Sequence, residues 1–94
     1  MDKWDIYQKA IEKWGAESQF GMAQEEAAEL IRAISKVLRG KESNIEEEIA
    51  DVEIMLEQLR LMLDEVKIEK EKQRKLNRLE KLVIGSESCE NAPS

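Results

Sequence analysis

Four carboxylates fall on helical faces that otherwise carry apolar residues. Glu26 and Glu29 are three residues apart, and so are Glu48 and Asp51. Residues at this spacing share one face of a helix. The face of the first pair continues as Leu30, Ala33 and Val37, and that of the second as Val52, Met55, Leu59 and Met62. The sequence therefore predicts two helices that each direct a pair of acids toward the interior.

Such a carboxylate cluster indicates a metal site. Four ionised acids in a poorly solvated interior repel one another, and a bound divalent cation removes that repulsion. The set offers only oxygen atoms, which favours Mg²⁺, with Mn²⁺ as a possible substitute. A single pair of this kind in an acidic helix is usually a surface feature. Two pairs on adjacent helices favour a metal centre.

Helices must position these acids, and the periodicity predicts four of them. The chain has 94 residues, 41% of them hydrophobic and 4% aromatic, with one Pro and four Gly, a composition that favours helices over a β-sandwich or barrel. The expected helices cover residues 2–14, a segment ending at 39 and starting on either side of 18–21, residues 45–63, and residues 66–84. The third either turns near Asp64 or runs on into the fourth.

These helices predict an all-α four-helix bundle formed by residues 1–84, followed by a disordered tail at 85–94. Ser43 to Glu46 have the pattern of a capping box at the start of the third helix. A heptad-like run then predicts its buried stripe: Ile45, Ile49, Val52, Leu56, Leu59 and Leu63. Three acids fall opposite this stripe and are expected in solvent: Glu46, Glu53 and Glu57. More than one apolar face remains, so we expect a homo-oligomer.

Composition removes several classes of function. Histidine is absent and Cys89 is the only cysteine, which excludes an internal disulfide, a cysteine zinc site and a histidine general base. The net charge of -6 argues against non-specific nucleic-acid binding. The uncharged stretches are too short to span a membrane, and the charged N-terminal segment lacks the pattern of a secretory signal. A cytoplasmic protein is the expectation.

The two acidic segments together resemble a known family. Glu25–Leu30 reads EEAAEL and Glu48–Asp51 reads EIAD, with eighteen residues between Glu29 and Glu48. This is similar to the signature E-E-x-x-E…E-x-x-D of the MazG-like all-α nucleoside triphosphate pyrophosphohydrolases, and the similarity covers about residues 14–63. The resemblance implies that a (deoxy)nucleoside triphosphate is hydrolysed to the monophosphate and pyrophosphate.

The resemblance also implies roles for individual residues. Mg²⁺ would be held by Glu26, Glu29, Glu48 and Asp51. Glu25 matches a position that can hold a further metal or activate water. Members of the family form dimers or tetramers of helical units, with the nucleotide between helices.

Substrate contacts are expected from basic and aromatic residues. Lys75 and Arg78, with Lys72 on the same face, are the candidates for phosphate binding. The alternative is that these side chains pair with Glu69, Glu71 and Glu80 along a solvated helix. For the base, the candidates are Trp14, Gln19 and Phe20; the alternative for Trp14 is a place in the core.

Two other functions remain open. Phosphoribosyl-ATP pyrophosphohydrolases resemble the same motif, but they are expected to carry a histidine after the second acidic segment, which this chain lacks. A non-catalytic helical interaction module would use its acids for salt bridges to a partner. Millimolar Mg²⁺ should stabilise a four-carboxylate site and leave an interaction module unchanged.

Overall fold

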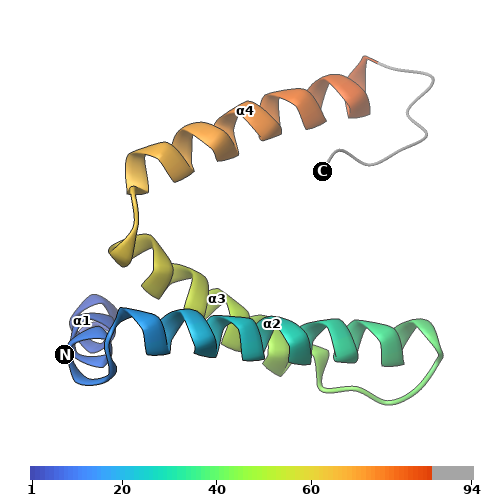
Figure 1. The fold of residues 1–94 in the computed structure, drawn as a ribbon. Helices are drawn as coiled ribbons and strands as arrows, with labels where there is room; N and C mark the ends of the chain where they lie inside the picture. The colour runs from blue at the N-terminus through green and yellow to red at the C-terminus, as the bar shows by residue number, and fades with distance from the viewer. Residues whose placement is uncertain (86–94) are drawn as a thin grey trace. The chain divides into compact units, whose positions relative to one another are not determined.

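A computed structural model describes residues 1–85, which form four α-helices and no strand (Figure 1), so the all-α prediction is confirmed. The helices are α1 (Lys3–Trp14), α2 (Ala16–Leu38), α3 (Ile45–Met62) and α4 (Glu65–Ile84). The chain divides into two compact units, the first covering Met1–Leu63 and the second beginning at Asp64. The MazG-like bundle and the oligomer stay predictions.

A single residue joins α1 to α2. Asp2 caps the start of α1 by accepting a hydrogen bond from the backbone N–H of Asp5, at 2.9 Å. Gly15 follows Trp14 with φ +86° and ψ 157°, a conformation that is essentially restricted to glycine. The second helix then begins at Ala16, before the ambiguous segment at 18–21. The backbone conformation of Gly15 thus sets the angle between α1 and α2.

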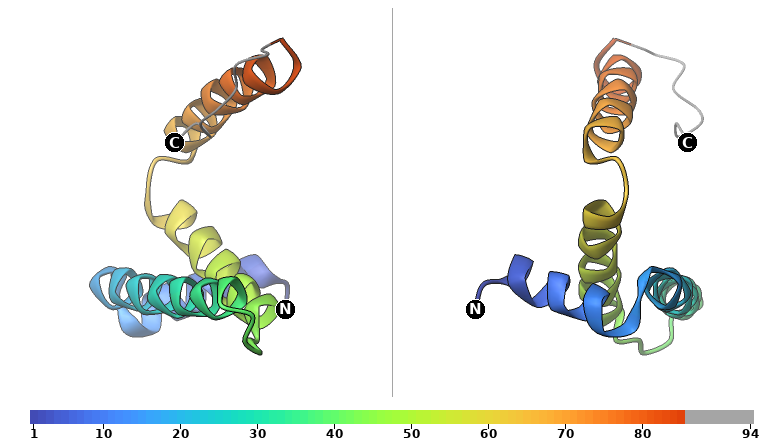
Figure 2. Two further views of the ribbon diagram at one scale, coloured as in Figure 1. Left: turned by 90° about the vertical axis from the view of Figure 1, so that its right-hand side faces the viewer. Right: turned by 60° about the vertical axis from the view of Figure 1, so that its left-hand side comes forward.

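The two long helices α2 and α3 run in opposite directions and pack side by side (Figure 2). Gly40, at φ +69°, follows the end of α2 and starts the loop that returns the chain. The predicted capping box is wrong, because Asn44 rather than Ser43 is the N-cap of α3. Ser43 instead donates its hydroxyl to the carbonyl of Ala33 at 3.2 Å and ties the loop back to α2.

The buried stripe of α3 differs from the predicted heptad run. Ile49, Leu56 and Leu63 are exposed, whereas the buried residues of α3 are Glu48, Met55 and Gln58. Both stripes have helical spacing, and the one that contacts α2 is the more polar of the two. Within the first unit the buried apolar residues are Tyr7, Ala33 and Met55, one from each helix.

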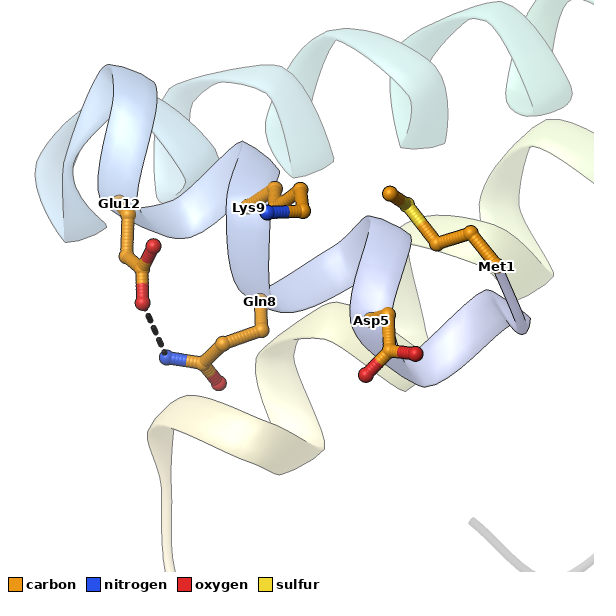
Figure 3. Close-up of a pocket in the computed structure, with 5 residues that line it drawn as sticks. All are labelled: Met1, Asp5, Gln8, Lys9 and Glu12. Atoms are coloured by element: carbon orange, nitrogen blue, oxygen red, sulfur yellow. Dashed lines mark hydrogen bonds between the residues drawn. The ribbon is translucent and has the colours of Figure 1, made fainter.

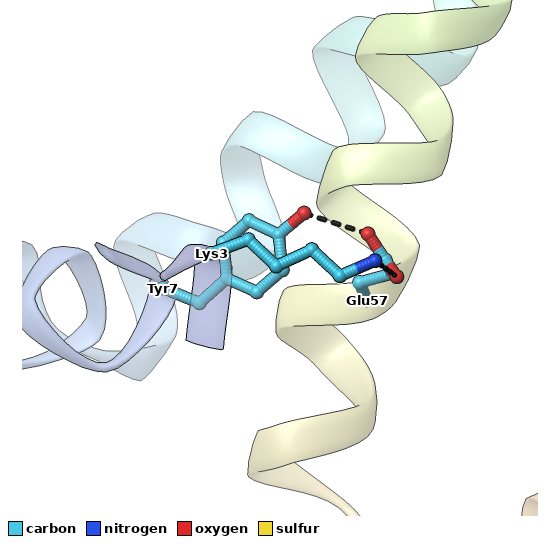
Figure 4. A network of polar contacts seen from close by, with 3 residues as sticks. All are labelled: Lys3, Tyr7 and Glu57. Carbon is cyan, nitrogen blue, oxygen red and sulfur yellow. Dashed lines mark hydrogen bonds and ion pairs between the residues drawn. The ribbon is translucent and has the colours of Figure 1, made fainter. Parts of the chain in front are cut away.

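A polar network fastens α1 to α3 (Figure 4). Tyr7 donates its hydroxyl to Glu57 Oε1 at 2.6 Å, and Lys3 Nζ lies 2.8 Å from Glu57 Oε2. The ring of Trp4 meets that of Tyr7 edge-on, with centroids 5.6 Å apart. The expectation that Glu57 is solvated is therefore wrong, because α1 covers that side of α3; Glu46 and Glu53 are exposed as expected.

The second unit contains α4. Asp64 caps it by accepting from the backbone N–H of Lys67 at 3.0 Å, and Leu63 before it is extended, so α3 and α4 are separate helices. No residue of α4 is buried. None of the helices within residues 1–85 combines the length and apolarity needed to cross a bilayer. The predicted tail falls, apart from Gly85, outside the described residues.

Candidate metal centre

Three of the four predicted metal ligands meet where α2 faces α3. Glu26, Glu48 and Asp51 each offer a carboxylate oxygen, and these oxygens lie within 4.8 Å of one another. Glu26 comes from α2, whereas Glu48 and Asp51 come from successive turns of α3. The antiparallel pairing of two amphipathic helices thus creates the cluster, as the sequence predicts.

Glu48 is the most enclosed of the three acids. Its side chain is buried, with the residue 9% exposed, and Oε1 accepts a hydrogen bond from Asn44 Nδ2 at 3.2 Å. Its other oxygen, Oε2, is buried and has no hydrogen-bond partner among residues 1–85. A buried carboxylate oxygen without a partner is costly, and a cation is the ligand that would satisfy it. The donor set therefore fits a divalent metal ion.

Glu26 is electrostatically disfavoured in its ionised form. Burial raises the pKa of Glu26 above its usual value, and the negative charges of Asp51 and Glu48 raise it further. A hydrogen bond with Asp51 and the more distant charge of Glu29 act in the same direction. A cation would reverse this preference by stabilising the ionised carboxylate.

Glu29 and Glu25 lie outside the group of three. Glu29 is exposed, and its Oε1 accepts from Arg32 Nη2 at 3.0 Å. Glu48 and Asp51 have the same three-residue spacing and both reach the cluster, whereas only Glu26 of the α2 pair does. Glu25 is also exposed. Their predicted roles as a fourth ligand and as a catalytic base stay predictions.

A second buried polar contact lies farther along the same two helices. Gln19, predicted to contact the substrate, is 3% exposed and donates through Nε2 to Gln58 Oε1 at 2.9 Å. Gln58 in turn donates through Nε2 to Met55 Sδ at 3.5 Å. A pocket of about 250 Å³ adjoins this amide pair, lined by Ala10, Trp14, Ser18, Gln19, Met22, Met55 and Gln58.

The same pocket is lined by Trp14, a predicted site residue, and by Gln58, which the sequence analysis did not identify. Trp14 is 59% exposed, so the alternative that it is a core residue is wrong; Phe20 is exposed and is not among the pocket residues. Gln58 was not among the predicted site residues. It lies seven positions after Asp51, and this heptad spacing would have placed it on the same face of α3.

The basic residues predicted to bind phosphate belong to α4. Lys72, Lys75 and Arg78 are all exposed on this helix. Pairing along the helix is also present, since Arg74 Nη2 lies 2.7 Å from Glu71 Oε1. Hydrogen bonding to Arg74, followed by its charge, lowers the pKa of Glu71. Phosphate binding by these residues stays a prediction.

Another pocket lies on α1 and contains none of the predicted site residues (Figure 3). Met1, Asp5, Gln8, Lys9 and Glu12 line it, and Gln8 Nε2 donates to Glu12 Oε2 at a long 3.5 Å. Successive turns of one helix supply most of this surface. It has no buried polar group, in contrast to the interface between α2 and α3.

Comparison of the chain with protein-family models, with curated proteins and with solved structures finds no match.

Proposed function

We propose that this protein hydrolyses (deoxy)nucleoside triphosphates to the monophosphate and pyrophosphate with the help of Mg²⁺, as a cytoplasmic homo-oligomer. The observation that carries the proposal is the meeting of Glu26, Glu48 and Asp51 across two antiparallel helices. The E-E-x-x-E…E-x-x-D resemblance names these positions as metal ligands. The unpartnered Glu48 Oε2 supports a cation there independently of that resemblance.

In this proposal the three clustered acids hold the metal, and Glu29 joins them when its exposed ion pair with Arg32 opens. Surface pairs of this kind contribute little stability, so exchanging Arg32 for a cation is not costly. When bound, Mg²⁺ supplies charge neutralisation for the triphosphate and for the pyrophosphate leaving group. A metal held by the acids would thereby allow a chain of net charge -6 to bind a polyanion.

The reaction itself needs a proton acceptor, and carboxylates supply it in a chain without histidine. Water attacks the α-phosphorus, a new P–O bond forms, and the bond to the bridging oxygen breaks to release pyrophosphate. Glu25 is placed next to the cluster in sequence and is exposed, so it can accept the proton that the water loses. Lys72, Lys75 and Arg78 are proposed to bind phosphate oxygens.

Product analysis tests the proposal. Purified protein is incubated with each common NTP and dNTP, and with phosphoribosyl-ATP, under Mg²⁺ or Mn²⁺. We expect monophosphate and pyrophosphate as products, and their loss in Asp51→Asn but not in Glu53→Gln, an exposed acid of the same helix. Turnover of phosphoribosyl-ATP alone would favour the first alternative. No turnover of any nucleotide would leave the non-catalytic interaction module.

A further inference from the structure

The interface between α2 and α3, which we call the α2–α3 seam, contains two polar layers. One is the Gln19–Gln58 pair and the other is the carboxylate cluster. Gln19 and Glu26 are seven residues apart on α2, and Asp51 and Gln58 are seven apart on α3. Seven residues complete almost two helical turns, so each glutamine lies on the same face as its acid, about 10.5 Å away along the axis. The Gln19–Gln58 hydrogen bond and the clustering of Glu26 with Asp51 show that both layers bridge the helices.

The pocket at the glutamine layer has the composition of a small-molecule site. Met22, Met55 and the exposed ring of Trp14 supply apolar walls, and the polar groups are the two buried amides and the side chain of Ser18. Small-molecule sites typically combine apolar walls with a few placed hydrogen-bonding groups. A volume of about 250 Å³ suits a single ring system better than a larger ligand.

The amide of Gln58 is bonded to a poor acceptor. Its Nε2 donates to the thioether sulfur of Met55 at 3.5 Å. A thioether accepts hydrogen bonds weakly, so a carbonyl or ring nitrogen of a ligand would be a better acceptor for this buried donor. A carboxamide carries a donor and an acceptor side by side, which complements the edge of a nucleobase. The indole of Trp14 offers a face for stacking.

We propose that the pocket between Trp14, Gln19 and Gln58 binds the nucleobase of a nucleoside triphosphate whose phosphates lie at the carboxylate cluster. This inference rests on the proposed function and adds the residues that select the base. An offset of about 10.5 Å between the two layers suits a ligand with a ring at one end and a phosphate chain at the other.

Fluorescence of Trp14 tests the pocket without relying on turnover. A Trp4→Phe chain leaves Trp14 as the single indole and keeps an aromatic ring against Tyr7. The probes are nucleosides, nucleoside triphosphates of each base, and inorganic tripolyphosphate, all with Mg²⁺. We expect a saturable change with at least one nucleobase and none with tripolyphosphate. The absence of any base-dependent change would overturn the proposal.

A double variant tests the amides. Gln19→Met with Gln58→Met replaces both partners of the hydrogen bond by apolar groups of similar shape, a change that can be nearly neutral for stability. We expect at least a tenfold loss of affinity for the preferred nucleotide and unchanged binding of tripolyphosphate. The control is Gln8→Met, on the outer face of α1. Equal affinities in the double variant and the control would contradict the inference.

A further variant tests the pocket independently if the double variant does not fold. Trp14 is exposed, so Trp14→Ala should fold, which circular dichroism verifies. Titration calorimetry should show at least tenfold weaker nucleotide binding, and unchanged affinity would count against the pocket. A Trp14 response without turnover overturns the proposed function and keeps the pocket. Nucleotide turnover without a Trp14 fluorescence response overturns the pocket and keeps the proposed function.

Discussion

One carboxylate oxygen of Glu48, Oε2, is buried and has no hydrogen-bond partner among residues 1–85. Two further acids, Glu26 and Asp51, lie within reach of the same point. Burial and these neighbours raise the pKa of Glu26, so the metal-free cluster is electrostatically unfavourable. The stability of the chain should therefore respond to divalent metal and to the loss of one charge.

Glu48→Gln should separate these two effects. Without metal the variant should melt no lower than the parent chain, because one of three repelling charges is gone. Mg²⁺ at one hundred times its Kd should stabilise the parent chain by about 2.7 kcal/mol and leave the variant nearly unchanged. Differential scanning calorimetry with and without Mg²⁺ measures both. A parent chain indifferent to both Mg²⁺ and Mn²⁺ would speak against the metal centre.

Tyr7 provides a second test at this scale. Its hydrogen bond to Glu57 raises the pKa of Tyr7 from 10.0 to about 12, with burial and the charge of Glu57 acting in the same direction. The neutral phenol is thus favoured in the folded state. Its contribution to stability is fully present below pH 10.0 and is lost as the pH rises to about 12.

Tyr7→Phe should remove this contribution. We expect Tm to fall by about 4–8 °C at neutral pH, since the loss of one partly exposed hydrogen bond costs about 1 kcal/mol. The variant should also lose less stability than the parent chain between pH 10.0 and about 12. Thermal melts across this range compare the two chains. Parallel loss of stability in both would mean that the Tyr7–Glu57 contact does not form.

At the scale of the helices, the two glycines near the start of α2 differ in whether their backbone conformation requires glycine. Gly15 adopts φ +86° and ψ 157°, a region essentially closed to other residues, whereas Gly21 lies inside α2. A Cβ at either position would meet no atom within 4 Å. Any effect of adding one therefore comes from the backbone and not from packing.

Gly15→Ala should destabilise the first unit by about 1–3 kcal/mol, because alanine is strained in that backbone conformation. Gly21→Ala should stabilise it by about 0.5–1 kcal/mol, because alanine loses less conformational entropy in a helix. Urea denaturation of both variants gives the two free energies of unfolding. Effects of the same sign would show that the joint between α1 and α2 is not built as described.

The helices were the most predictable part of the fold, and their rotation was the least. Gly15 and Gly40 end their helices as the sequence suggests. The third helix carries two overlapping stripes, and the wheel alone could not show that Met55 rather than Leu56 faces α2. The choice depends on what the partner helix offers, which is a tertiary property.

Part of the candidate site was also predictable from the sequence. Glu26, Glu48 and Asp51 could be found because acids on an apolar face are conspicuous in the sequence. Glu29 shares the spacing but is exposed and accepts a hydrogen bond from Arg32, because the spacing alone does not determine which member of the pair faces α3. Glu57 could not be placed, because its partners Lys3 and Tyr7 come from a helix about fifty residues earlier.

On the scale of the whole molecule, apolar surface remains uncovered. Ile49 and Leu56 are spaced by seven residues on α3 and are 42% and 53% exposed, and Leu63, which follows the end of α3, is 50% exposed. Ile31 and Leu38 form a similar exposed pair on α2. Stripes at heptad spacing are suited to packing against another helix. This surface supports the prediction of a homo-oligomer.

Leu56→Glu should weaken that association. A charge within this exposed apolar surface would have to be buried without a partner on assembly. Sedimentation equilibrium should show multiples of the chain mass for the parent and a shift toward the single chain for the variant. Ala50→Glu adds the same charge to another exposed face of α3 and should keep the parent's mass. A monomeric parent chain would refute the prediction directly.

The equal seven-residue spacing on α2 and α3 fixes the distance between the glutamine layer and the carboxylate layer. One residue inserted between Gln19 and Glu26 would rotate one layer by about 100° relative to the other and break its pairing with α3. A matching change in α3, between Asp51 and Gln58, would be needed to restore it. The length of ligand that spans both layers can therefore change only through paired insertions or deletions in the two helices.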